Sequence, residues 1–152
     1  MNQGEKLIAG FPGMGKHHPQ GPFDFPFTPG DLRVEVKFRN ANFFFNNGQV
    51  DGETTEQFIW TKIAARQFDW LILIGVDLGG VPHYWISPDR VVRSRYPRIM
   101  TPSDGGKITC ILNPFRPLRP RAQVINAHKL TYEELYADCQ NGRLGYTVIR
   151  RS

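Results

Sequence analysis

Three charged side chains near the N-terminus have the types and the spacing to bind a divalent cation and act on a phosphate. Glu35 and Lys37 lie two residues apart in the segment "LRVEVKFRN", and Asp24 lies upstream of them. Two carboxylates that are brought close together repel one another unless a cation lies between them, and hard oxygen ligands suit Mg²⁺ or Mn²⁺. The ammonium group of Lys37 could align a water molecule or stabilise negative charge on an attacked phosphate. Asp31 is the rival aspartate, but it lies too near Glu35 along the chain to face it, so we expect it to cap a turn.

The segment that carries Glu35 and Lys37 is the clearest strand in the first half of the chain. Apolar and charged residues alternate through residues 32–40, so one face would pack on a core while the other is charged. The preceding segment, "FDFPF", predicts a short strand, and "TPGD" between the two predicts a turn. A hairpin of these strands would bring Asp24 beside Glu35. The alternative interpretation is that Glu35 and Lys37 form an ordinary salt bridge on a solvent-facing strand.

This arrangement resembles the PD-(D/E)XK nuclease superfamily, which has the restriction-endonuclease-like fold. The motif of that family is matched by "PFD", which supplies Asp24, and by "EVK", which supplies Glu35 and Lys37. The resemblance implies that Asp24, Glu35 and the main-chain carbonyl of Val36 bind Mg²⁺, for which Mn²⁺ could substitute. It also implies that Lys37 assists the hydrolysis of phosphodiester bonds in DNA, and that the products carry 5′-phosphate and 3′-hydroxyl ends.

Two weaker candidates come from the same resemblance, which covers roughly residues 4–77. Glu5, in "QGEKL", is the only candidate for the acidic residue that the family often carries on its first helix. Gln57 would be the glutamine that some branches carry on the helix after the motif, although Thr61 stands where those branches have a tyrosine. Pro22 is one residue further from the aspartate than in a literal PD pair.

The remaining patterns predict an α/β fold with a central mixed β-sheet flanked by helices. We expect a single nuclease domain, with a core over about residues 4–90 and a C-terminal elaboration over about 91–152. The periodicity predicts helices over residues 2–9, 55–67 and 130–140. The segment "DWLILIGVDL" predicts a strand buried on both faces, and "VPHYWIS" and "KITCIL" predict further strands.

The charge of the chain favours a polyanionic partner. The net charge is +5, and most of the positive charge is arginine, whose planar guanidinium matches phosphate oxygens two at a time. A nuclease that cuts both strands of a duplex most simply acts as a two-fold homodimer, so we expect a homodimer or higher homo-oligomer. A non-catalytic nucleic-acid-binding protein of the same fold is the alternative. The candidate DNA-binding residues are Arg33, Arg39, Arg93, Arg95, Arg98, Arg116, Arg119 and Arg121.

A glycine-rich segment, "GFPGMGKHH", resembles a phosphate-binding loop but lacks two of its features. His17 stands where the pattern G-x-x-x-x-G-K-[ST] requires a hydroxyl residue, and the next residues cannot begin a helix. We therefore expect a glycine-rich loop, with nucleotide binding as a third alternative. His17 and His18 are adjacent, and adjacent residues rarely bind one ion together, so we expect both to face solvent or a DNA phosphate.

Cellular location is predicted by what the sequence lacks. The N-terminus has no signal-peptide pattern, and no apolar run is long enough to cross a bilayer, which predicts a cytoplasmic protein without a membrane segment. The two cysteines, Cys110 and Cys139, are too few for a disulfide framework and are expected to be free thiols.

Overall fold

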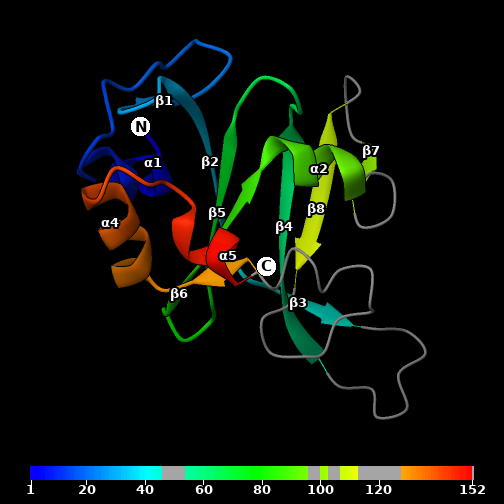
Figure 1. Cartoon of the computed structure of the whole chain (residues 1–152). Coiled ribbons are helices and arrows are strands. Elements are labelled where there is room, and N and C mark those ends of the chain that lie inside the picture. Colours follow the sequence, from blue (N-terminus) through cyan, green and yellow to red (C-terminus); the bar gives the residue numbers. More distant parts are fainter. Residues whose placement is uncertain (46–53, 96–99, 103–106, 113–127, 152) are drawn as a thin grey trace.

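A five-stranded mixed sheet lies at the centre of the computed structural model, which describes residues 1–45, 54–95, 100–102, 107–112 and 128–151 (Figure 1). The strand order is β1-β2-β5-β6-β9. The parallel pair is β2 with β5, and the other neighbours are antiparallel. The bounds are β1 (Phe25–Phe27), β2 (Leu32–Asn40), β5 (Trp70–Val76), β6 (Pro82–Pro88) and β9 (Lys129–Leu130).

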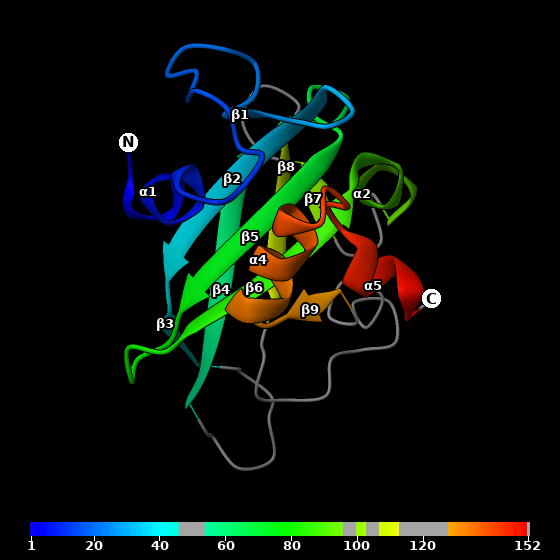
Figure 2. The same ribbon diagram turned by 60° about the vertical axis from the view of Figure 1, so that its left-hand side comes forward.

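Helices cover one face of this sheet. They are α1 (Gln3–Ala9), α4 (Tyr132–Gln140) and α5 (Tyr146–Arg150), and Figure 2 shows α1 and α4 in front of the long strands. The core on this side joins Ile8 of α1 and Leu135 of α4 to the apolar residues of β2 and β5. Helix α1 lies so close to β2 that a Cβ atom added at Gly4 would be 2.6 Å from the Cβ atom of Phe38.

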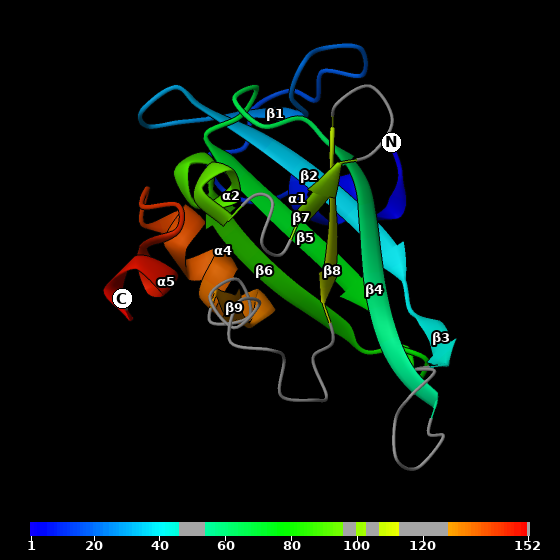
Figure 3. The ribbon, with the colours of Figure 1, turned by 90° about the vertical axis from the view of Figure 1, so that its right-hand side faces the viewer.

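A second sheet covers the other face, as Figure 3 shows for β4 and β8. Its order is β3-β4-β8-β7, with β3 (Asn42–Phe45), β4 (Thr54–Ile63), β7 (Met100–Pro102) and β8 (Ile108–Leu112), and α2 (Asp89–Arg95) follows β6. A second core lies between the sheets and contains Phe58, Trp60, Leu71 and Trp85. The two sheets are also joined by a hydrogen bond, because the indole N–H of Trp60 donates to the carbonyl oxygen of Ile74 over 3.0 Å.

The helix that we predicted over residues 55–67 is wrong, because this segment is the strand β4. Phe58 and Trp60 are buried while Ile59 and Thr61 are partly exposed, which is the period of two that a strand requires. The segment is also rich in threonine and aromatic residues, which favour strands. The apolar residues at positions 58, 59, 63 and 68 resemble one face of a helix only if Trp60 is left out.

Most other elements are confirmed. The predicted N-terminal helix is α1, and the predicted hairpin is formed by β1 and β2. Strand β5 is buried on both faces, since helices pack on one side and the second sheet on the other. The C-terminal helix begins with a capping box, in which Thr131 accepts a hydrogen bond from the backbone N–H of Glu134 and the Glu134 side chain accepts one from that of Thr131. Cys110 and Cys139 are free and buried.

The architecture is therefore α/β, with a mixed sheet flanked by helices, as expected. The connection from β2 to β5 differs from the expected one, because it runs through two strands of a second sheet rather than through a helix. Among the residues that the structure describes, there is no helix long and apolar enough to cross a membrane.

Candidate metal and phosphate site

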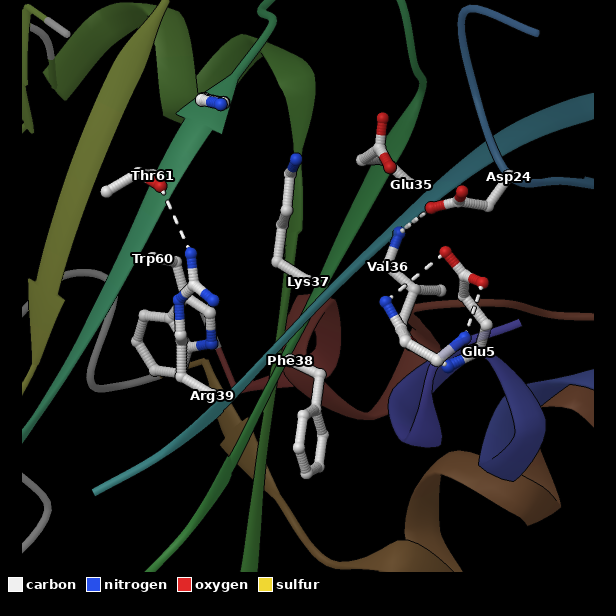
Figure 4. Close-up of a pocket in the computed structure, with 11 residues that line it drawn as sticks. Glu5, Asp24, Glu35, Val36, Lys37, Phe38, Arg39, Trp60 and Thr61 are labelled. Carbon is white, nitrogen blue, oxygen red and sulfur yellow. Dashed lines mark hydrogen bonds between the residues drawn. The ribbon is translucent and has the colours of Figure 1, made fainter. Parts of the chain in front are cut away.

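The side chain of Asp24 extends the pairing between β1 and β2 beyond the last backbone pair. The backbone N–H of Asp24 donates to the carbonyl oxygen of Val34 over 3.0 Å. Two residues further along β2, the N–H of Val36 donates to Oδ2 of Asp24 over 2.8 Å (Figure 4). The N–H and C=O groups of one strand residue point to the same strand edge, so the carbonyl of Val36 also faces the Asp24 side. Asp24 and the main chain of Val36 are therefore neighbours at this edge of β2.

Glu35 lies on the face of β2 opposite to Val34 and Val36, and its carboxyl group interacts directly with that of Asp24. Burial raises the pKa of Glu35 from 4.5 to about 9, helped by a hydrogen bond to Asp24 and by the negative charge of Asp24. The positive charge of Lys37 and a backbone hydrogen bond from Val36 oppose this rise. Burial and the neighbouring Asp24 carboxyl group therefore both favour the neutral form of the Glu35 side chain.

Lys37 and the two carboxyl groups line one cavity of about 240 Å³ between β2 and β4. The face of β2 that the sequence left as a possible solvent face is thus a wall of this cavity. The opposite wall is Trp60, Thr61 and Lys62 of β4. Arg39 joins the two walls, because its guanidinium donates to Oγ1 of Thr61 over 3.3 Å (Figure 4). The guanidinium also donates to the carbonyl oxygen of Ile59 over 3.2 Å.

The pairing of β4 with β8 is irregular at this wall. The register shifts between Trp60 and Ile63, and Lys62 has a positive φ of 58°. Bulges of this kind redirect a side chain and occur often beside active sites. Lys62, which the sequence did not single out, is placed by this bulge at the cavity.

Glu5 comes to the same cavity from α1. Its carboxylate closes the capping box of the helix, accepting from the backbone N–H of Asn2 over 3.0 Å, while the N–H of Glu5 donates to Oδ1 of Asn2 over 2.8 Å. Glu5 therefore has a structural role that the sequence did not predict, in addition to its position at the site.

His17 is a second residue near the cavity that the sequence analysis did not place at a site. Its Nε2 atom lies 3.3 Å from Oε2 of Glu5 and 3.6 Å from Oδ1 of Asp24, and its side chain is only 16% exposed. The expectation that His17 faces solvent is therefore wrong. His18 does remain exposed, and its ring stacks on that of Phe23.

The glycine-rich loop places His17 by running along β1. The N–H of Gly15 donates to the carbonyl oxygen of Pro26 and the N–H of His18 donates to that of Asp24, each over 2.8 Å. A Cβ atom at Gly13 would be 2.6 Å from the Phe27 ring, and one at Gly15 would be 2.7 Å from Cγ of Pro26. Gly13 and Gly15 thus allow the loop to pack on β1, which accounts for these two glycines without a nucleotide.

The other predicted residues lie outside the cavity or outside the described residues. Gln57 is in β4 opposite Asn42, so the helix expected to carry it is absent, and its side chain is not among those described. Arg33 pairs with Asp69 over 3.2 Å, and Arg93 with Asp89 over 2.8 Å. The side chain of Arg95, together with Arg98, Arg116, Arg119 and Arg121, falls outside the part of the chain that the structure describes.

Comparisons with known proteins suggest no function, so the function is inferred from the geometry of the site. No protein-family model matches the chain, and no curated protein matches it.

Proposed function

We propose that this protein is a metal-dependent DNA endonuclease that hydrolyses phosphodiester bonds with the site motif, and a variant of the fold, of the PD-(D/E)XK superfamily. The observation that carries the proposal is the pairing of Asp24 and Glu35 in a cavity that also contains Lys37. Lys37 lowers the pKa of Glu35, but burial and then the hydrogen bond and charge of Asp24 raise this pKa to about 9, so Lys37 is not the dominant neighbour of Glu35.

The residues present fit a divalent cation such as Mg²⁺. A cation between the Asp24 and Glu35 carboxyl groups would relieve the repulsion that helps to raise the pKa of Glu35. The carboxylates of Asp24 and Glu35 and the carbonyl of Val36 would hold the cation. Once bound, it would polarise a phosphoryl oxygen and lower the pKa of a coordinated water.

The chain's own cations would orient the substrate. The ammonium of Lys37, close enough to Glu35 to lower its pKa, would neutralise charge on the attacked phosphate or position the water. Arg39 and Lys62 line the same cavity and would bind phosphates of the DNA strand. To cut a duplex, two copies would act together as a two-fold dimer.

The test uses Glu35→Gln and Lys37→Ala in a plasmid-nicking assay with Mg²⁺. We expect both variants to lose at least about 100-fold in cleavage rate, a size typical of losing one catalytic group. Both should still bind DNA in Ca²⁺, because the phosphate contacts remain. Glu133→Gln and Lys107→Ala change the same residue types at exposed positions and should cleave like the parent.

Two results would contradict the proposal. Cleavage by folded Glu35→Gln and Lys37→Ala at the parental rate would remove these residues from the chemistry. Tight DNA binding by the parent, without cleavage of duplex, single-stranded or four-way-junction DNA in Mg²⁺ or Mn²⁺, would instead favour the non-catalytic DNA-binding protein.

A further inference from the structure

We propose that Glu5, His17 and Asp24 form a second divalent-cation site, which shares Asp24 with the Asp24–Glu35 pair and prefers a transition-metal ion such as Mn²⁺ to Mg²⁺. One ligand atom of each residue lies within 4.8 Å of the others, close enough for one ion to contact all three. This inference concerns metal binding and does not require that the protein cleaves DNA.

The imidazole of His17 provides the evidence that points to a ligand. Its Nε2 atom is shielded from solvent, and it has no hydrogen-bond partner of acceptable geometry among the described residues. The two carboxylate oxygens at 3.3 Å and 3.6 Å lie near it without forming such a bond. A buried polar atom without a partner is costly, and a metal ion would satisfy it.

The position of His17 is fixed by its surroundings rather than by the two carboxylates. The backbone N–H of the next residue donates to the carbonyl oxygen of Asp24, and the imidazole packs on the ring of Phe25 with centroids 5.1 Å apart. The site is therefore built before any ion binds, which a selective metal site requires.

The two oxygens of Asp24 face different partners. Oδ2 accepts the N–H of Val36, and Oδ1 is the atom near Nε2 of His17. Asp24 can thus contact two cations at once, as a bridging carboxylate does in two-metal phosphodiesterase sites. The neighbouring Asp24–Glu35 site offers only oxygen ligands, which suit Mg²⁺, whereas an imidazole favours Mn²⁺ and later transition metals.

The competing interpretation is an ion pair in which a protonated His17 bridges Glu5 and Asp24. Both interpretations predict that the three residues are close together. They differ in whether nitrogen coordinates a metal, so the experiment must detect that nitrogen directly.

The test measures Mn²⁺ binding by calorimetry and the coupling of bound Mn²⁺ to imidazole nitrogen by pulsed electron paramagnetic resonance. Glu35→Gln isolates the proposed second site, and we expect this variant to bind one Mn²⁺ ion with a clear nitrogen signal. Adding His17→Gln should abolish the nitrogen signal and weaken binding at least about 10-fold. His18→Gln, at the exposed neighbouring histidine, should change neither measurement.

Absence of a nitrogen signal in Glu35→Gln with Mn²⁺ bound would overturn the second site and leave the ion pair. The nitrogen signal of Glu35→Gln tests the second site even if the His17→Gln variant fails to fold. Failure of the proposed endonuclease function has a separate signature, namely a Mn²⁺ site with coordinated nitrogen in a protein that does not cleave DNA.

Discussion

The raised pKa of Glu35 should make the stability of the metal-free protein depend on pH. The pKa of Glu35 is about 9 in the folded protein and 4.5 in a reference state without these interactions. Between these values the folded state binds more protons than the unfolded state, so the free energy of unfolding falls as pH rises. The loss begins above the unfolded pKa and is complete above about 9.

Glu35→Gln removes this titration. Between pH 5 and pH 9 we therefore expect the parent to lose about 5 kcal/mol of unfolding free energy that the variant does not lose. Urea unfolding in a chelator at both pH values measures this difference. Glu133→Gln, at an exposed position, is the control. A constant difference between parent and Glu35→Gln across this range would show that Glu35 ionises normally and that the carboxylates are not paired.

At the scale of single residues, the sequence predicts the centre of the site but not its surroundings. Asp24 and Glu35 are joined by a tight hairpin, so alternation and turn length determine which side chains meet. His17 comes from a loop, whose path depends on glycines that pack against β1 and not on any periodicity. The contact of His17 with Glu5 also needs the packing of α1 on β2, which the sequence does not specify.

At the scale of elements, β4 brings to the cavity a lysine that the sequence did not single out. Lys62 has a left-handed backbone, which costs a non-glycine residue about 1–2 kcal/mol and is retained where the surroundings impose it. The bulge directs Lys62 to the cavity, so we infer that the strain serves to present an ammonium to a phosphate.

Lys62→Gly separates the effect of backbone strain at this position, which changes stability, from the effect of the lysine charge, which changes DNA affinity. Glycine adopts a positive φ readily, so we expect the free energy of unfolding to stay equal or rise by about 0.5 kcal/mol. Loss of one phosphate contact should lower DNA affinity and reduce the slope of log affinity against log salt by about 1. Chemical unfolding and fluorescence-anisotropy titrations measure the two effects.

Arg66→Gly is the matched control for Lys62→Gly. Arg66 also has a positive φ, 72°, and is exposed, but it does not line the cavity. It should show the same effect on stability with unchanged DNA affinity. If both variants lose affinity equally, the loss reflects general charge, and Lys62 has no special role at the cavity.

Helices and strands could be predicted from the sequence where the hydrophobic pattern and the capping or turn residues indicated the same structure. Strand β5 has an unbroken apolar run, and α4 begins with Thr131 followed three residues later by Glu134, so pattern and cap point to the same structure. Residues 54–63 are ambiguous, because their apolar spacing fits a helix in part while their threonines and aromatics fit a strand. The contact of Trp60 with Ile74 and the pairing with β8 decide the outcome, and both involve distant parts of the chain.

At the scale of the whole molecule, the two layers that cover the central sheet have different roles. The helical layer holds α1, and therefore Glu5, against β2. The second sheet closes the cavity from the other side with Trp60, Thr61 and Lys62. The carboxylates, the imidazole and the cations thus come from elements on both sides of β2. Spacing along the sequence could not predict this convergence, because it depends on how the layers pack.

The positive charge of the chain should control DNA affinity through salt. Replacing Arg116, Arg119 and Arg121 together by alanine should reduce the slope of log affinity against log salt by up to about 3, if each contacts one phosphate. Arg143, Arg150 and Arg151 provide a control variant that removes the same charge. Arg143 and Arg150 lie over the ring of Tyr146, and Arg151 pairs with Glu134, so these groups are engaged within the protein.

The two triple variants distinguish direct contacts between these arginines and DNA phosphates, a localised footprint, from attraction of DNA by the net charge of the protein. Titrations in Ca²⁺ between about 50 mM and 200 mM salt, where phosphate contacts change affinity most, give the slope of each variant. A localised footprint predicts a smaller slope only for the first variant. Equal slopes would mean that net charge attracts DNA without these arginines touching it. Phosphate binding would then be left to the cavity, where Arg39 and Lys62 stand opposite the carboxylates.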